Sequence, residues 1–238
     1  MNDLPQIILY SALSGSTILV GGLLAHFFDR YVHKGFVKTE ITHTSIAFGG
    51  GILVAAVALV LVPQGMGVLP VVLMAGLFMA GAISFFFIDK YLGKRGDAAS
   101  QIMAMLLDYL PEAIALGAVF AEDANLGLLL ALFIAFQNFP ESFNAFLEMR
   151  EGGSTAKFCL SIFSLLSVIG IGASVSGYYL LTDRPVPTAA LMLYSSGGII
   201  YLIFQDIAPM SKLKRAWLPA LGASFGFLVG MIGVKLLY

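Results

Sequence analysis

Two short segments of this chain place carboxylates in the middle of apolar sequence. The first reads Asp108-Tyr-Leu-Pro-Glu112, and the second reads Gln137-Asn138-Phe-Pro-Glu141. In each segment the polar residue four positions before the glutamate lies on the same face of a helix as that glutamate. An ionisable side chain at the centre of a bilayer costs about 2.5–3.5 kcal/mol even on insertion scales. If these segments cross a membrane, their carboxylates therefore indicate a functional site.

The composition predicts that they do cross a membrane. Hydrophobic residues make up 59% of the 238 residues and charged residues only 11%, and the mean hydropathy is +0.92. A soluble domain of this size needs far more charged surface than that. The sequence therefore predicts an all-α integral membrane protein that lies in a lipid bilayer. Nothing in it indicates a nucleic-acid partner.

Eight stretches of about 20 residues are apolar enough to cross a hydrocarbon core about 30 Å thick. The connections between them are short and carry most of the charged residues, which predicts a compact eight-helix bundle and a single transmembrane domain over residues 1–238. The expected spans cover residues 5–28, 42–62, 68–88, 100–121, 126–149, 157–181, 187–208 and 217–237.

The basic residues predict how these spans are oriented. Eleven of the 13 Lys and Arg residues lie in or beside the connections that follow the first, third, fifth and seventh spans. Cytoplasmic loops carry an excess of Lys and Arg, so these four connections are expected in the cytoplasm. Both termini are then on the non-cytoplasmic side, and the expected location is the plasma membrane, most simply a bacterial inner membrane.

The fourth and fifth spans form an antiparallel hairpin in this topology, which brings the two polar segments to one depth. Asp108 and Glu112 lie about 12–18 Å along a helix that enters near residue 100, close to the midplane. Oxygen ligands gathered there predict a cation site, because a bound cation keeps buried carboxylates ionised and offsets their desolvation. We expect the carboxylates of Asp108, Glu112 and Glu141 within about 8 Å of one another. The alternative is a structural cluster of hydrogen-bonded polar groups.

The two polar segments resemble the His-Asn-x-Pro-Glu-Gly and His-x-x-Pro-Glu signatures on the fourth and fifth spans of the ZIP (Zrt/Irt-like) metal transporters. The sequence from Ala47 to Pro63 is similar to the second span of that family, and the sequence from Ser196 to Pro209 is similar to the seventh. The resemblance implies an eight-helix bundle that carries a divalent metal toward the cytoplasm and assembles as a homodimer.

By this resemblance Asp108, Glu112 and Glu141 are the primary metal ligands, and Gln137 and Asn138 support them. The chain also departs from the family pattern. Asp108 and Gln137 stand where histidines are expected, and Tyr109 and Ala113 replace Asn and Gly. The sixth span lacks the Glu-Pro of many members and has Ser167 and Val168 in that neighbourhood. An all-oxygen ligand set favours manganese, ferrous iron or even magnesium over zinc, although zinc also binds carboxylates.

Five further polar residues are candidates for an ion pathway. His26 and Asp29 end the first span, His43 opens the second, and Asp206 lies in the seventh; Asn144 continues the Glu141 face toward the cytoplasm. The alternative interpretation is that they are interfacial side chains that reach water.

The sequence leaves two other functions open. A homologue that binds or senses a metal without transporting it is favoured by the missing histidines. An intramembrane hydrolase would use Glu112 and Glu141 as acid and base, but no catalytic histidine or nucleophile accompanies them at that depth. We therefore expect a transporter of zinc, manganese or iron and not an enzyme.

Overall fold

The computed structural model describes residues 3–32, 35–92, 98–120, 123–213 and 216–238, and all the regular structure in these ranges is helical. In chain order the elements are α1 (Leu4–Tyr31), α2 (Phe36–Ala56), η1 (Val57–Leu61), α3 (Val62–Val68), α4 (Val71–Leu92), α5 (Ala98–Phe120), α6 (Ala124–Glu151), α7 (Ala156–Leu181), α8 (Pro185–Leu202), η2 (Ile203–Ile207), α9 (Ala208–Ser211) and α10 (Leu218–Leu237). The labels η1 and η2 mark single turns of π-helix.

Eight helices of the described ranges are long and apolar enough to cross a membrane, as the sequence predicted. The main differences are at prolines. The second span runs on through Pro63 to Val68, and the next begins only at Val71, because Leu69 before Pro70 is extended (φ −101°, ψ 143°). A residue before proline avoids the helical region, so Pro70 sets this boundary.

Pro63 and Pro209 lie within their spans without ending them. Each follows a π-helical turn, η1 or η2, and occupies the first turn of the next α-helical segment. A π-turn changes the hydrogen-bond register, and π-bulges of this kind often lie at functional sites. The helix therefore absorbs the missing proline N–H instead of breaking.

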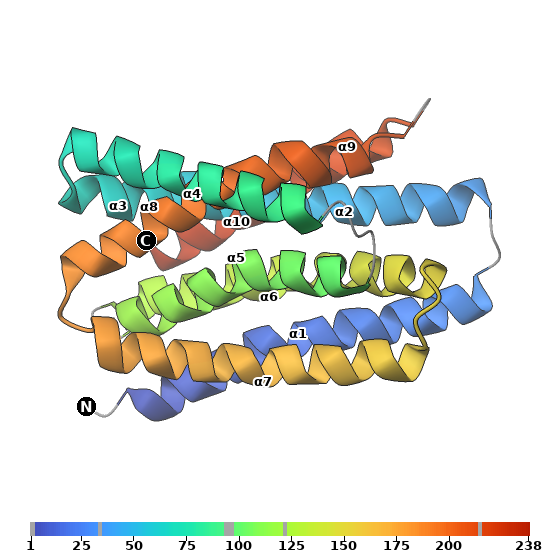
Figure 1. Ribbon diagram of the computed structural model, residues 1–238, viewed down its shortest axis with the longest axis horizontal. Coiled ribbons are helices and arrows are strands. Elements are labelled where there is room, and N and C mark those ends of the chain that lie inside the picture. Colours follow the sequence, from blue (N-terminus) through green and yellow to red (C-terminus); the bar gives the residue numbers. More distant parts are fainter. Residues whose placement is uncertain (1–2, 33–34, 93–97, 121–122, 214–215) are drawn as a thin grey trace.

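The helices form three tiers (Figure 1). In the middle tier α5 and α6 lie side by side. They pack against α1 and α7 on one side, and against α2 and α8 on the other, with α4 and α10 at the outside of that tier. Both chain termini lie at one end of the bundle, which we call the terminal end (Figure 1). Helices α1, α4, α6 and α9 end at the opposite end, which we call the basic end because the sequence at and after these helix ends holds most of the Lys and Arg.

Paired glycines bring α2 against α10 and α8 against α4. A Cβ at Gly51 would overlap the carbonyl oxygen of Ala223, and one at Gly226 would overlap that of Phe48. Only the missing side chains permit such close contact between backbones.

The α8–α4 contact repeats this geometry residue for residue. Gly197 faces the carbonyl of Phe78, and Gly81 faces that of Tyr194. In each pair a glycine faces the carbonyl three residues before the partner glycine.

This match relates α2 to α8 and α4 to α10. Gly51 precedes η1 by six residues, and Gly197 precedes η2 by six residues; a proline follows each π-turn at the same interval. Because α2 and α8 run in opposite directions (Figure 1), the matched helix pairs have the arrangement of an inverted repeat. Helices α5 and α6 also run in opposite directions (Figure 1), and each has a Pro-Glu segment in its interior, so we treat these two segments as counterparts in the repeat.

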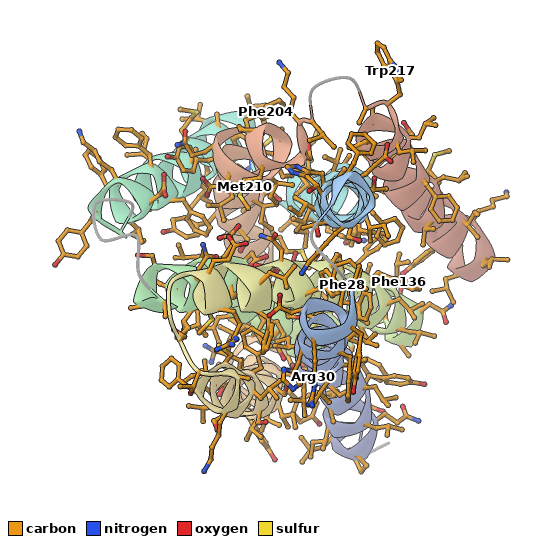
Figure 2. The ribbon with its side chains drawn as sticks, turned by 90° about the vertical axis from the view of Figure 1, so that its right-hand side faces the viewer. Phe28, Arg30, Phe136, Phe204, Met210 and Trp217 are labelled. Carbon is orange, nitrogen blue, oxygen red and sulfur yellow. The ribbon has the colours of Figure 1, made fainter. Side chains whose placement is uncertain are left out.

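The outer surfaces are apolar. Viewed from the basic end, Phe204 and Trp217 point away from the bundle (Figure 2), and they are 72% and 83% exposed. The most exposed side chains of α4, such as Val72, are also aliphatic or aromatic. Such a surface is stable in lipid and not in water.

Candidate functional site

The two Pro-Glu segments lie inside α5 and α6, and both helices continue through their prolines. Asp108, Glu112, Gln137 and Asn138 are all at least 97% buried, and Glu141 is partly buried. The expectation that helical spacing puts them on the facing sides of one antiparallel pair is consistent with their contacts.

Two pairs of side chains, about one helical turn apart, connect α5 to α6. Gln137 Nε2 donates a hydrogen bond to Glu112 Oε2. The carboxyl groups of Asp108 and Glu141 interact as the second pair. The two pairs are counterparts of each other in the inverted repeat, because Asp108 corresponds to Gln137 and Glu112 corresponds to Glu141. All four side chains lie at the interface between α5 and α6.

The site also holds polar atoms that lack hydrogen bonds. Glu112 Oε1, Gln137 Oε1 and both polar atoms of the Asn138 amide are buried and have no partner among the described residues. Buried polar atoms are nearly always paired, so four such atoms together need an explanation. In the described ranges no three His, Cys, Asp or Glu side chains are arranged so that they could hold a metal ion. Any cation bound here would need the amide oxygens, or a movement of the carboxylates.

A cavity of about 280 Å³ reaches this cluster from the basic end. Asp108, Gln137, Glu141 and Asn144 line it, together with further residues of α2, α4, α5, α6, α8, η2 and α9. Among the described residues its lining does not include Glu112 or Asn138. The cavity therefore lies between part of the middle tier and helices α2 and α8. It gives access to three of the five predicted ligands, namely Asp108, Gln137 and Glu141.

Two acidic residues line the outer part of this cavity. One is Asp206 on η2, which was predicted from the sequence as a pathway candidate. The other is Asp89, which was not predicted from the sequence. Tyr201 donates a hydrogen bond to Asp89 Oδ2 at 2.7 Å. Asp89 lies at the end of an apolar run beside Lys90, so it has the sequence signature of an ordinary helix terminus. Asp89 and Tyr201 are 112 residues apart in the chain, so no local sequence pattern predicts their contact.

A second cavity, of about 680 Å³, lies at the same end and shares Asn144 with the first. Asp29 and His43 line it. Asp29 also pairs with Lys38 at 3.1 Å, and His43 Nδ1 donates to the backbone oxygen of Met210. His26 lines neither cavity and packs its ring edge-on against Phe146, with 5.8 Å between centroids.

Glu148 lines the second cavity. Its carboxylate accepts hydrogen bonds from Gln101 Nε2 and from Asn144 Nδ2, the latter at 2.8 Å. Its position near the end of a span is typical of a solvated helix terminus. The structure instead makes it the centre of a polar contact between α5 and α6.

Tyr109 points away from the site. Its ring fills a notch against α1 and α7, where a Cβ at Gly170 would overlap the hydroxyl and one at Gly15 would come within 2.6 Å of it. The hydroxyl is buried without a partner in the described part of the chain. Tyr109 therefore fixes the rotation of α5 about its axis, which keeps Asp108 and Glu112 on the α6 side.

The observed fold and site define a helical integral membrane protein with a buried polar cluster at the centre of its bundle. No protein-family model matches the chain, and no curated protein is matched by its sequence.

Proposed function

We propose that the chain is a divalent metal transporter of the ZIP type, with a substrate site between α5 and α6. The observation that carries the proposal is a cluster of buried carboxyl and amide groups with unpaired oxygens at the inner end of a cavity. Ionisable and polar groups at membrane depth mark ion pathways far more often than structural contacts. The likeness of the two Pro-Glu segments to the ZIP signatures supports the same function.

Asp108 and Glu141 present carboxylate oxygens to a cation that enters the cavity, and Gln137 presents its free amide oxygen. Glu112 and Asn138 are further oxygen donors of the same site, and they lie outside the lining of this cavity. Oxygen-only donor sets suit hard or borderline cations. Manganese and ferrous iron are accordingly the preferred substrates, and zinc is the third candidate.

Movement of the substrate requires the site to face each side of the membrane in turn. The middle tier packs closely on α1 and α7, since glycines bring α5 against α7 at Gly117 and α1 against α6 at Gly21. We assign α1, α5, α6 and α7 to one rigid unit that moves against α2, α4, α8 and α10.

The basic end is assigned to the cytoplasm by the distribution of Lys and Arg. The cavity then opens to the cytoplasm, both termini are on the other side, and the metal moves inward through a bacterial inner membrane. A homodimer is the proposed assembly, by family resemblance.

The decisive experiment is uptake by purified protein in liposomes across zinc, manganese, ferrous iron, cobalt, cadmium and magnesium. Saturable uptake of one or more of these cations above that of empty liposomes is the expected result. Binding to the protein in detergent without uptake would instead identify a sensor, and neither binding nor uptake would leave the cluster structural.

A further inference from the structure

Glu112 and Glu141 are counterparts in the inverted repeat, yet they lie in different surroundings. Glu141 lines the cavity that opens at the basic end. Glu112 is 2% exposed, lies outside that lining, and is covered by Gln137, which donates to it. The two glutamates therefore differ in access, although the repeat makes their positions equivalent.

Inverted repeats give a rule for the opposite conformation. A transporter built from two such repeats reaches its other open state when each repeat takes the conformation of its partner. Under this exchange Asp108 and Gln137 trade places, so both remain at the site. Glu112 then lines the open cavity, as Glu141 does now, and Glu141 becomes buried and covered, as Glu112 is now.

The same exchange identifies the wall of a cavity at the terminal end. Asn144 corresponds to Ala115, because both follow their glutamate by three residues, and Asp206 corresponds to Val60, because both precede their proline by three residues. Ala115 and Val60 are now 1% and 2% exposed. The terminal side is thus closed by packed apolar residues at the positions where the basic side is open and acidic.

We infer that the two glutamates serve opposite sides of the membrane: Glu141 contacts the cation when the site is open at the basic end, and Glu112 contacts it when the site is open at the terminal end. Asp108 stays with the cation in both conformations. This inference rests on the proposed transport function, and it divides the roles within the same site.

Sided labelling of single cysteines tests the division without any metal. The sequence has one cysteine, Cys159, which is buried on α7. In a Cys159→Ser background, Glu112→Cys and Glu141→Cys are placed singly in liposomes of uniform orientation. A charged, membrane-impermeant methanethiosulfonate is then applied from one side at a time. Asn144→Cys and Ala115→Cys form a second pair that leaves every carboxylate of the site in place.

We expect Glu141→Cys and Asn144→Cys to react at least about tenfold faster from the basic end, and Glu112→Cys and Ala115→Cys to show the reverse preference. Reaction of Glu112→Cys from the basic end as fast as Glu141→Cys would overturn the inference, and so would no reaction from either side. If the glutamate variants do not fold, the Asn144 and Ala115 pair decides by the same criterion.

Metal uptake by the Cys159→Ser background separates this inference from the proposed function. Uptake together with the wrong sidedness removes the division of roles and leaves a transporter. Correct sidedness without uptake of any cation removes metal transport, while the two access states remain.

Discussion

Gln137 donates a hydrogen bond to Glu112 across the α5–α6 interface, and the carboxyl groups of Asp108 and Glu141 interact as the counterpart pair. The two contacts lie about one helical turn apart along the same antiparallel pair of helices. They connect α5 of one repeat to α6 of the other, at the same place as the candidate cation site. A change to either glutamate therefore acts on a pair of residues and not on one carboxylate alone.

The first prediction separates a cation site from a structural polar cluster. Glu112→Gln and Glu141→Gln keep the shape and hydrogen-bonding capacity of the side chain but remove a negative charge. We expect each to lower metal uptake at least about tenfold, equivalent to about 1.4 kcal/mol, with the protein still folded. The matched control is Asp183→Asn, which removes an exposed charge between α7 and α8 and should leave uptake unchanged. Near-normal uptake in both glutamate variants would make the carboxylates structural.

The second prediction concerns metal preference. Asp108 and Gln137 stand where the ZIP signatures have histidine, and imidazole nitrogen is a softer donor than oxygen. The double variant Asp108→His with Gln137→His should raise uptake of zinc relative to manganese. Competition between the two metals in liposomes measures the ratio. A folded, active double variant with an unchanged or manganese-shifted ratio would mean that these positions do not contact the ion.

The third prediction tests the glycine contacts that define the repeat. A Cβ at Gly197 would overlap the carbonyl oxygen of Phe78, whereas one at Gly76 on the outer face of α4 meets nothing within 4 Å. Gly197→Ala should therefore destabilise the protein by about 1–3 kcal/mol through overpacking, and Gly76→Ala should not. Thermal unfolding in detergent compares the two. Equal melting temperatures would argue against the close α4–α8 contact.

The fourth prediction uses a contact outside the spans. Tyr238 donates a hydrogen bond to Asp123 Oδ2 at 2.6 Å, and this bond lowers the pKa of Asp123. Burial and the Asp123 contact raise the pKa of Tyr238. The stabilisation is present above the ordinary Asp pKa of about 4 and below the ordinary Tyr pKa of about 10. It is lost as the pH falls through the lowered pKa of Asp123, or rises through the raised pKa of Tyr238.

Tyr238→Phe should accordingly melt at a lower temperature than the parent near neutral pH, and the difference should vanish in strong acid. Melting curves of both proteins in detergent across this range measure it. A difference that persists at the lowest pH would mean that the hydroxyl contributes by packing and not through the Asp123 carboxylate.

Membrane-spanning helices and their approximate positions follow from the sequence alone. A run of about 20 apolar residues must satisfy its backbone hydrogen bonds internally, so hydropathy by itself predicts each helix. Helical spacing likewise put Asp108 with Glu112, and Gln137 with Glu141, on single faces.

The tertiary structure decided which of those groups meet. Three features depend on residues far apart in the chain. They are the hydrogen bond from Gln137 to Glu112, the hydrogen bond from Tyr201 to Asp89, and the end of the bundle at which the cavity opens. The inverted repeat emerged from the matched glycine contacts between α2 and α10 and between α4 and α8, together with the matched π-turns of α2 and α8. Local sequence sets hydrogen-bond patterns within a helix, whereas close packing between helices sets the surroundings of each buried carboxylate.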